Sequence, residues 1–157
     1  MPSWAQDGAS VRLERVAPAR WQATYTFPRP VESLRFIRAA ANHRERVWTV
    51  VTPGYVWARD SATQVLRLAS DGQPTTTITL EFPQFTDPLP KEYELFQPFW
   101  DGSVALYTGH FYARPTGPGY PDDVAAVSAW LASRRVHPEA APLPRESLKL
   151  PMDCGGV

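Results

Sequence analysis

Residues 98–114 read PFWDGSVALYTGHFYAR, and this stretch is the strongest indication of the fold. The pair Asp101-Gly102 separates two runs that are rich in aromatic and β-forming residues. An Asp-Gly pair in that setting predicts a β-hairpin, because a type I′ turn needs two residues that tolerate a positive φ. Both faces of the second run carry apolar side chains, so we expect that strand to lie inside the domain.

The chain before this hairpin repeats a pattern with a period of two. Residues 20–27 alternate apolar and polar side chains, and residues 75–82 do the same. Such alternation predicts strands that bury one face. Shorter strands are expected at 11–16, 34–38, 47–51, 55–58 and 63–68. Strands separated by turns and not by helices predict an all-β domain, an antiparallel β-sandwich over residues 10–114.

The composition and the spacing of apolar residues change after residue 114. Residues 115–157 begin with a linker rich in proline and glycine, and Pro121-Asp122-Asp123 then provides a helix start. Apolar side chains at helical spacing follow, at Val124, Val127, Trp130 and Leu131. We therefore expect one C-terminal amphipathic helix over about residues 122–135 and an extended, proline-rich tail. Residues 1–9 are expected to be an N-terminal extension.

Composition excludes several classes of function. The chain has 157 residues, enough for one domain, and 16 basic residues balance 16 acidic ones. This balance predicts neither a nucleic-acid partner nor a membrane-binding surface, and no apolar run approaches the roughly 20 residues of a membrane span. Cys154 is the only cysteine, so an internal disulfide is impossible. The oligomeric state is left open.

The first residues bear on localisation. Ser3 and Ala5 are small residues spaced like those before a signal-peptidase site, which favours a periplasmic or extracellular protein. The charged and apolar regions of a leader are missing from this end, so a cytoplasmic location is the alternative.

The sequence contains no motif of a known catalytic or cofactor site. It lacks His-Glu-x-x-His, a glycine-rich phosphate loop, Gly-x-Ser-x-Gly and Cys-x-x-Cys, so we expect no metal and no cofactor. His110 is the candidate acid–base group, with Asp101 or Glu94 of the same hairpin as its carboxylate partner. The alternative is a structural histidine bonded to a loop carbonyl. Residues 43–46, HRER, are interpreted as a solvated turn.

Three tryptophans are candidates for ligand binding. Trp48, Trp57 and Trp100 could form a platform on which a sugar or an aromatic side chain stacks. The alternative is that these residues belong to the core, since aromatic residues at strand spacing usually do.

Four short segments of the sequence resemble a known protein family. They are YTFP at 25–28, LRF at 34–36, VWTV at 47–50 with Pro53-Gly54, and FWDGSVALYTGHF at 99–111. Together they resemble the N-terminal β-sandwich domain of M1/M61-type aminopeptidases. The resemblance implies a domain that packs beside a zinc peptidase domain, whose His-Glu-x-x-His helix carries the zinc ligands and the catalytic glutamate. That helix is not in this sequence, so no catalytic residue is carried over.

The resemblance leaves two expectations for the whole protein. The chain is either a piece of a longer, exported peptidase-like protein or a stand-alone descendant without the enzyme. The first functional hypothesis is therefore a non-catalytic accessory domain that binds a protein partner or a missing C-terminal domain. It predicts an exposed apolar patch larger than the few hundred Å² usual for monomers. The second is a peptide- or carbohydrate-binding module that uses the three tryptophans. The third is a small enzyme built on His110.

Overall fold

The structure is a computed structural model that describes residues 9–36, 43–60, 63–84, 95–101, 103–120 and 147–151. Antiparallel β-strands make up most of these residues, which confirms the all-β class. The short helix α1 (His43–Val47) and the 3₁₀ helix η2 (Thr108–Phe111) complete the described elements. The helix expected over residues 122–135 lies outside the described residues.

The larger sheet has five strands in the order β11-β1-β2-β7-β4, and each neighbouring pair is antiparallel. Its strands are β1 (Ser10–Ala17), β2 (Arg20–Val31), β4 (Thr49–Val50), β7 (Thr75–Pro83) and β11 (Ser147–Pro151). Between β2 and β7, Ala23 lies opposite Leu80 and Tyr25 opposite Ile78, and all four are buried. The alternation predicted for residues 20–27 and 75–82 is therefore confirmed.

The smaller sheet has four antiparallel strands in the order β10-β3-β6-β5. They are β3 (Ser33–Phe36), β5 (Tyr55–Asp60), β6 (Thr63–Leu68) and β10 (Ala113–Thr116). Side chains from both sheets meet in one hydrophobic core, which includes Tyr25, Leu34, Phe36, Leu66, Ile78, Leu80, Phe82 and Phe111. Burial of this many large apolar side chains is the main force that holds the two sheets together.

The hairpin predicted around Asp101-Gly102 forms, but it differs from the prediction in two respects. Strands β8 (Phe96–Pro98) and β9 (Val104–Leu106) pair as a separate two-stranded ribbon, and the N–H of Phe99 donates to the carbonyl of Ser103 at 2.8 Å. Among the described non-glycine residues only Ala19 has a positive φ, so Asp101 does not form a type I′ turn. Its carboxylate instead accepts hydrogen bonds from the N–H and the hydroxyl of Ser103, as in an Asx turn.

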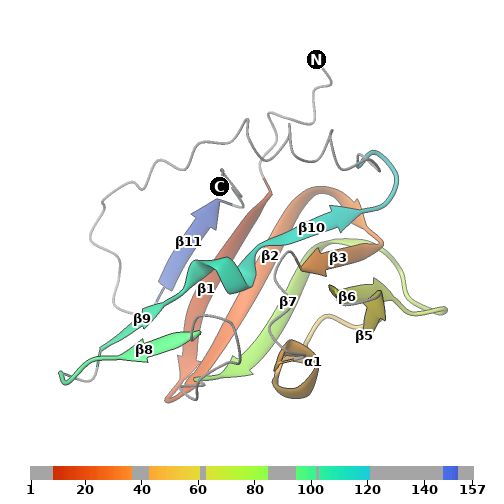
Figure 1. The fold of residues 1–157 in the computed structure, drawn as a ribbon. Helices are drawn as coiled ribbons and strands as arrows, with labels where there is room; N and C mark the ends of the chain where they lie inside the picture. The colour runs from red at the N-terminus through yellow and green to blue at the C-terminus, as the bar shows by residue number, and fades with distance from the viewer. Residues whose placement is uncertain are drawn as a thin grey trace.

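The second strand of the hairpin was expected inside the domain, and this expectation is wrong. Strand β9 is half-buried at Val104 and Leu106 and exposed at Ala105. The apolar run turns into η2 after Leu106, so Phe111 reaches the core from η2 and not from β9. Figure 1 shows the β8–β9 ribbon at one side of the fold, away from β5 and β6.

The expected tail also differs from the structure over five of its residues. Ser147–Pro151 forms β11, which pairs with β1 in a register that places Leu148 opposite Leu13 and Leu150 opposite Val11. Without β11, one side of β1 would present unpaired backbone N–H and C=O groups. The pairing satisfies these groups and makes β11 the edge of the larger sheet.

Two glycines allow the turn before β5 to contact the turn before β7. The carbonyl of Gly54 accepts a hydrogen bond from the N–H of Ala69 at 2.8 Å, and Gly54 has a φ of +83°. A Cβ at Gly72 would overlap the carbonyl oxygen of Gly54 and lie 2.8 Å from Cδ1 of Leu68. The contact therefore requires a glycine at position 72.

Replacement of Gly72 by alanine is expected to lower the free energy of unfolding by about 2 kcal/mol, because the backbone of one turn must move to relieve the overlap. Urea unfolding followed by tryptophan fluorescence measures the change. The neighbouring variant Gln73→Ala is the control, since Gln73 is exposed and its truncation should change stability by less than about 0.5 kcal/mol. Equal stability of Gly72→Ala and the parent chain would contradict the close packing of the two turns.

Candidate functional site

The residues of the predicted acid–base site occupy different environments. His110 lies on η2 and is 1% exposed, whereas Asp101 lies at the exposed tip of the β8–β9 hairpin. The hydroxyl and the N–H of Ser103 donate to the Asp101 carboxylate and hold its pKa below the ordinary value. Glu94 lies outside the described residues. A buried imidazole and an exposed carboxylate that is already bonded to Ser103 are a poor basis for acid–base catalysis.

The backbone of His110 takes part in a buried structural contact with α1. Its carbonyl accepts hydrogen bonds from Nε of Arg44 at 3.1 Å and from Nη2 at 2.8 Å. Arg44 is 0% exposed, and its Nη1 donates to Oε1 of Gln64 at 2.7 Å. The guanidinium also lies 4.5 Å from the ring centroid of Phe36 and 5.5 Å from that of Trp48, within cation–π range.

These contacts correct the interpretation of residues 43–46 as a solvated turn. The segment begins α1, and both His43 and Arg44 are buried. One guanidinium joins α1 to η2 through His110 and to β6 through Gln64. Because Arg44 has no access to solvent, this cluster can hold the fold together but cannot meet a substrate.

Two further titratable groups lie in the same region. Burial, together with the positive charges of Arg44, His110 and Arg46, lowers the pKa of His43 to about 4. His43 is therefore neutral at pH 7. Burial also raises the pKa of Tyr25, whose hydroxyl donates to the carbonyl of Phe111 at 2.9 Å. Both groups are neutral at pH 7, as their burial requires.

The three candidate tryptophans do not share one surface. Trp48 is buried and stacks on Phe82 and Phe111, with ring centroids 4.7 and 5.4 Å apart. Trp57 is half-buried, and its Nε1 donates to the carbonyl of Trp48 at 3.1 Å. Trp100 is 98% exposed at the hairpin tip. The core interpretation therefore fits Trp48, whereas Trp57 packs against the core with part of its surface exposed, and Trp100 is the most exposed member of the set.

The β8–β9 hairpin fixes the backbone position of Trp100. Leu95 and Phe96 at its base are fully buried, and the ring of Phe96 packs 5.6 Å from Trp21. The N–H of Tyr107 donates to the carbonyl of Leu95 at 3.0 Å and closes the base of the hairpin. The candidate functional site is thus a short ribbon with a buried base and an aromatic tip, at which Phe99 is 50% exposed beside Trp100.

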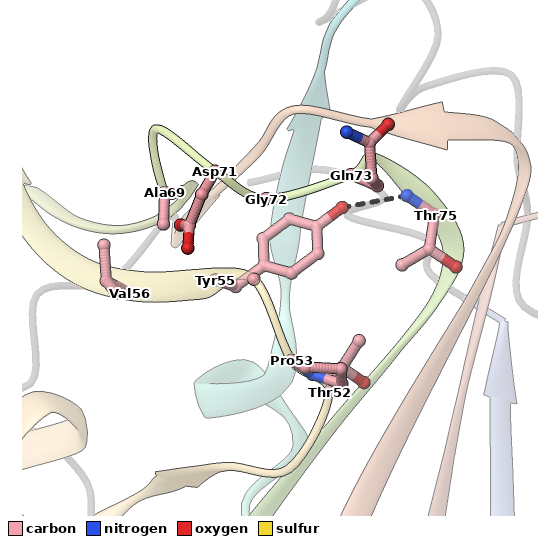
Figure 2. A pocket seen from close by; sticks show the side chains of 10 residues that line it. Thr52, Pro53, Tyr55, Val56, Ala69, Asp71, Gly72, Gln73 and Thr75 are labelled. Carbon is pink, nitrogen blue, oxygen red and sulfur yellow. Dashed lines mark hydrogen bonds between the residues drawn. The ribbon is translucent and has the colours of Figure 1, made fainter.

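Sequence reasoning missed a pocket between the two glycine-containing turns. It has a volume of about 730 Å³ and is open to solvent. Figure 2 shows the side chains that line it. It is lined by Thr52, Pro53, Gly54, Tyr55, Val56, Ala69, Asp71, Gly72, Gln73 and Thr75. The Tyr55 hydroxyl donates to the carbonyl of Val31 at 2.5 Å and accepts from the N–H of Thr75 at 3.1 Å. Pro53-Gly54 and Asp71-Gly72 are each typical of a turn, but no local signal shows that the two turns meet.

The remaining observations concern metals, membranes and known proteins. In the described residues, His, Cys, Asp and Glu side chains form no group of three or more that could hold a metal ion. Neither described helix is long and apolar enough to cross a membrane. Comparison of the chain with models of protein families, with curated proteins and with solved structures found no match.

Proposed function

We propose that this chain is a non-catalytic interaction domain that binds a protein partner through the tip of the β8–β9 hairpin. The observation that carries the proposal is the 98% exposure of Trp100 beside the half-exposed Phe99. Tryptophan is the residue type most enriched among side chains that dominate binding energy at protein interfaces. The other large hydrophobic side chains that are exposed among the described residues, Val16, Val51 and Val56, are smaller.

The rigidity of the hairpin supports this role. Asp101 and Ser103 fix the turn by two hydrogen bonds, and buried Leu95 and Phe96 anchor the base in the core. An aromatic side chain on a preformed turn loses little conformational entropy when a partner covers it. The contact therefore retains most of the free energy gained by burying the indole.

The family resemblance supports the same proposal. Under this proposal, the two sheets are the layers of a β-sandwich related to the N-terminal domains of M1/M61-type aminopeptidases. A peptidase-like domain is therefore the first partner to test. Those domains work beside a catalytic domain and carry no catalytic residues of their own. An exposed aromatic tip suits such a docking role.

A second candidate function rests on the same side chain. The exposed indole of Trp100 could stack on a sugar or on an aromatic group of a peptide. Titration of the chain with oligosaccharides and aromatic peptides, followed by tryptophan fluorescence, tests this candidate. A saturable change that is lost in Trp100→Ala favours a small ligand, and an unchanged spectrum excludes it for the ligands used.

Replacement of Trp100 by alanine is expected to remove partner binding and to leave stability unchanged within about 0.5 kcal/mol, because the side chain makes almost no contact with the fold. A photo-crosslinking amino acid at position 99, beside an intact Trp100 and introduced in the cells of origin, should give one discrete adduct that is lost when Trp100 is also replaced by alanine. The same group at position 16 is the control, since Val16 is exposed on β1. Adducts that are absent, or identical for both positions, would refute the proposal.

A further inference from the structure

The outer side of β5 is a free strand edge in the described part of the chain. All six residues of β5, from Tyr55 to Asp60, pair with β6, and no described strand pairs with the other side. In an antiparallel pair about half of the backbone N–H and C=O groups of each strand point away from the partner. The outer side of β5 therefore carries a row of backbone groups that a further strand could bond.

The other described strand edges are less suited to pairing. Strand β4 has two residues, β8 and β9 have three each, β10 contains Pro115, and β11 ends at Pro151. Short strands and prolines are common means by which proteins block an exposed edge. Strand β5 has six residues and no proline, and its outward-facing Val56 is exposed.

The pocket of about 730 Å³ adjoins one end of this edge. Tyr55 and Val56, the first two residues of β5, form part of its wall, and the turns that carry Pro53 and Gly72 form the rest (Figure 2). The contact between the two turns and the paired Tyr55 hydroxyl hold these walls in place. The pocket is thus formed before any ligand arrives, which lowers the cost of binding.

The charges around β5 define the ligand further. Asp71 is the only charged residue among the described residues that line the pocket, and no described ion pair includes it. At the far end of β5, Arg59 is paired with Glu45 and Asp60 with Arg35. Arg59 and Asp60 cancel, so the strand itself carries no net charge. The exposed Arg67 lies opposite Val56 on β6, on the side of β5 away from the free edge, so Asp71 is the charge on the pocket wall that a side chain in the pocket meets.

We propose that β5 and the adjoining pocket bind an extended peptide segment of a partner, which adds a fifth strand to the smaller sheet. Backbone hydrogen bonds to β5 supply affinity, and a basic side chain beside Asp71 supplies selectivity. This is the β-augmentation mode of peptide recognition, in which a sheet edge and a neighbouring pocket act together. The site lies on the β5–β6 side of the fold, away from the β8–β9 hairpin (Figure 1), so it does not depend on the function proposed above.

The test is a titration of the ¹⁵N-labelled chain with the acetylated and amidated hexapeptide TVKVTV, followed by amide chemical shifts. Saturable shifts are expected at β5 and at the turns around Gly54 and Gly72. The peptide TVEVTV should bind about three- to fivefold more weakly, because its carboxylate faces Asp71. A TVKVTV peptide with alternate backbone nitrogens methylated should not bind, because it cannot donate the hydrogen bonds of a strand.

Protein variants separate this site from the hairpin tip. Asp71→Asn should weaken TVKVTV binding about twofold and bring TVKVTV and TVEVTV to the same affinity, because it removes the attraction to lysine and the repulsion of glutamate. Asp101→Asn is the matched control and should leave the affinity unchanged, as should Trp100→Ala. No saturable shift at β5 with millimolar peptide, equal binding of the methylated peptide, or shifts confined to the hairpin would each overturn the proposal.

Discussion

Replacement of Arg44 by alanine is expected to lower the free energy of unfolding by about 3–5 kcal/mol, the range for truncating a large, fully buried side chain. The substitution removes the bonds from the guanidinium to His110 and Gln64 and the stacking over Phe36. It also leaves a cavity where a fully buried side chain stood, and both oxygen acceptors lose a donor inside the core. Urea unfolding at pH 7 measures the loss.

A neighbouring arginine provides the control. Arg46 lies two residues further along α1 and is exposed, so Arg46→Ala should change stability by less than about 0.5 kcal/mol. If the two variants were equally stable, the burial of Arg44 would contribute nothing and its proposed role would be wrong.

Two other substitutions at position 44 separate charge from packing. Arg44→Met fills much of the space without a charge, and we expect it to recover part of the loss seen for alanine. Arg44→Lys keeps the charge but presents a single ammonium, which cannot reach the carbonyl of His110 and the amide of Gln64 in the same planar geometry. A lysine variant as stable as the parent would show that charge alone, and not the guanidinium geometry, holds α1.

The strands could be predicted because their signal is local. Residues 20–27 and 75–82 alternate in the sequence, and the same residues alternate between buried and exposed in β2 and β7. The period follows from the geometry of an extended backbone and needs no knowledge of the partner strand. The position of the Asp101-Gly102 hairpin was predictable for the same reason, since a turn depends on the residues within it.

What the sequence could not show depends on distant residues. Arg44 is buried because Gln64 and the backbone of His110, 20 and 66 positions away, supply acceptors, and the run HRER alone resembles a solvated turn. The type of turn at Asp101 depends on the hydrogen bonds of Ser103, which compete with the type I′ geometry. Likewise, the aromatic residue types of Trp48 and Trp100 do not reveal that one is buried in the core and the other is exposed at a hairpin tip.

The candidate site also depends partly on local sequence and partly on contacts between distant residues. Trp100 was among the three tryptophans selected from sequence, but its separation from Trp48 and Trp57 follows only from the fold. The pocket beside β5 could not be inferred at all, because its two turns are joined by backbone contacts between Gly54 and Gly72. Two glycines in separate turns carry no sequence signal that they touch.

The stability of the protein is expected to fall by up to about 3 kcal/mol as the pH is lowered from 6.5 to 4, through the protonation of His43. Its pKa is about 4 in the folded chain, against an ordinary value of 6.5, because the side chain is 1% exposed and near the positive charges of Arg44, His110 and Arg46. Between these two values the unfolded chain binds a proton that the folded chain does not. The contribution of His43 is therefore complete above pH 6.5 and decreases as the pH falls towards 4.

Unfolding by urea at pH 7, 6, 5.5 and 5 isolates this contribution, since most carboxylates stay ionised over this range. The free energy of unfolding should decrease by at most about 1.4 kcal/mol for each pH unit in the window, and His43→Gln should remove most of this slope because glutamine does not titrate. The imidazole signals of His43, followed by NMR, report its protonation in the folded chain directly and should titrate near pH 4. A slope that persists in His43→Gln would assign the pH dependence to other groups. An imidazole that titrates near pH 6.5 would show that the His43 side chain is hydrated and not buried at the start of α1.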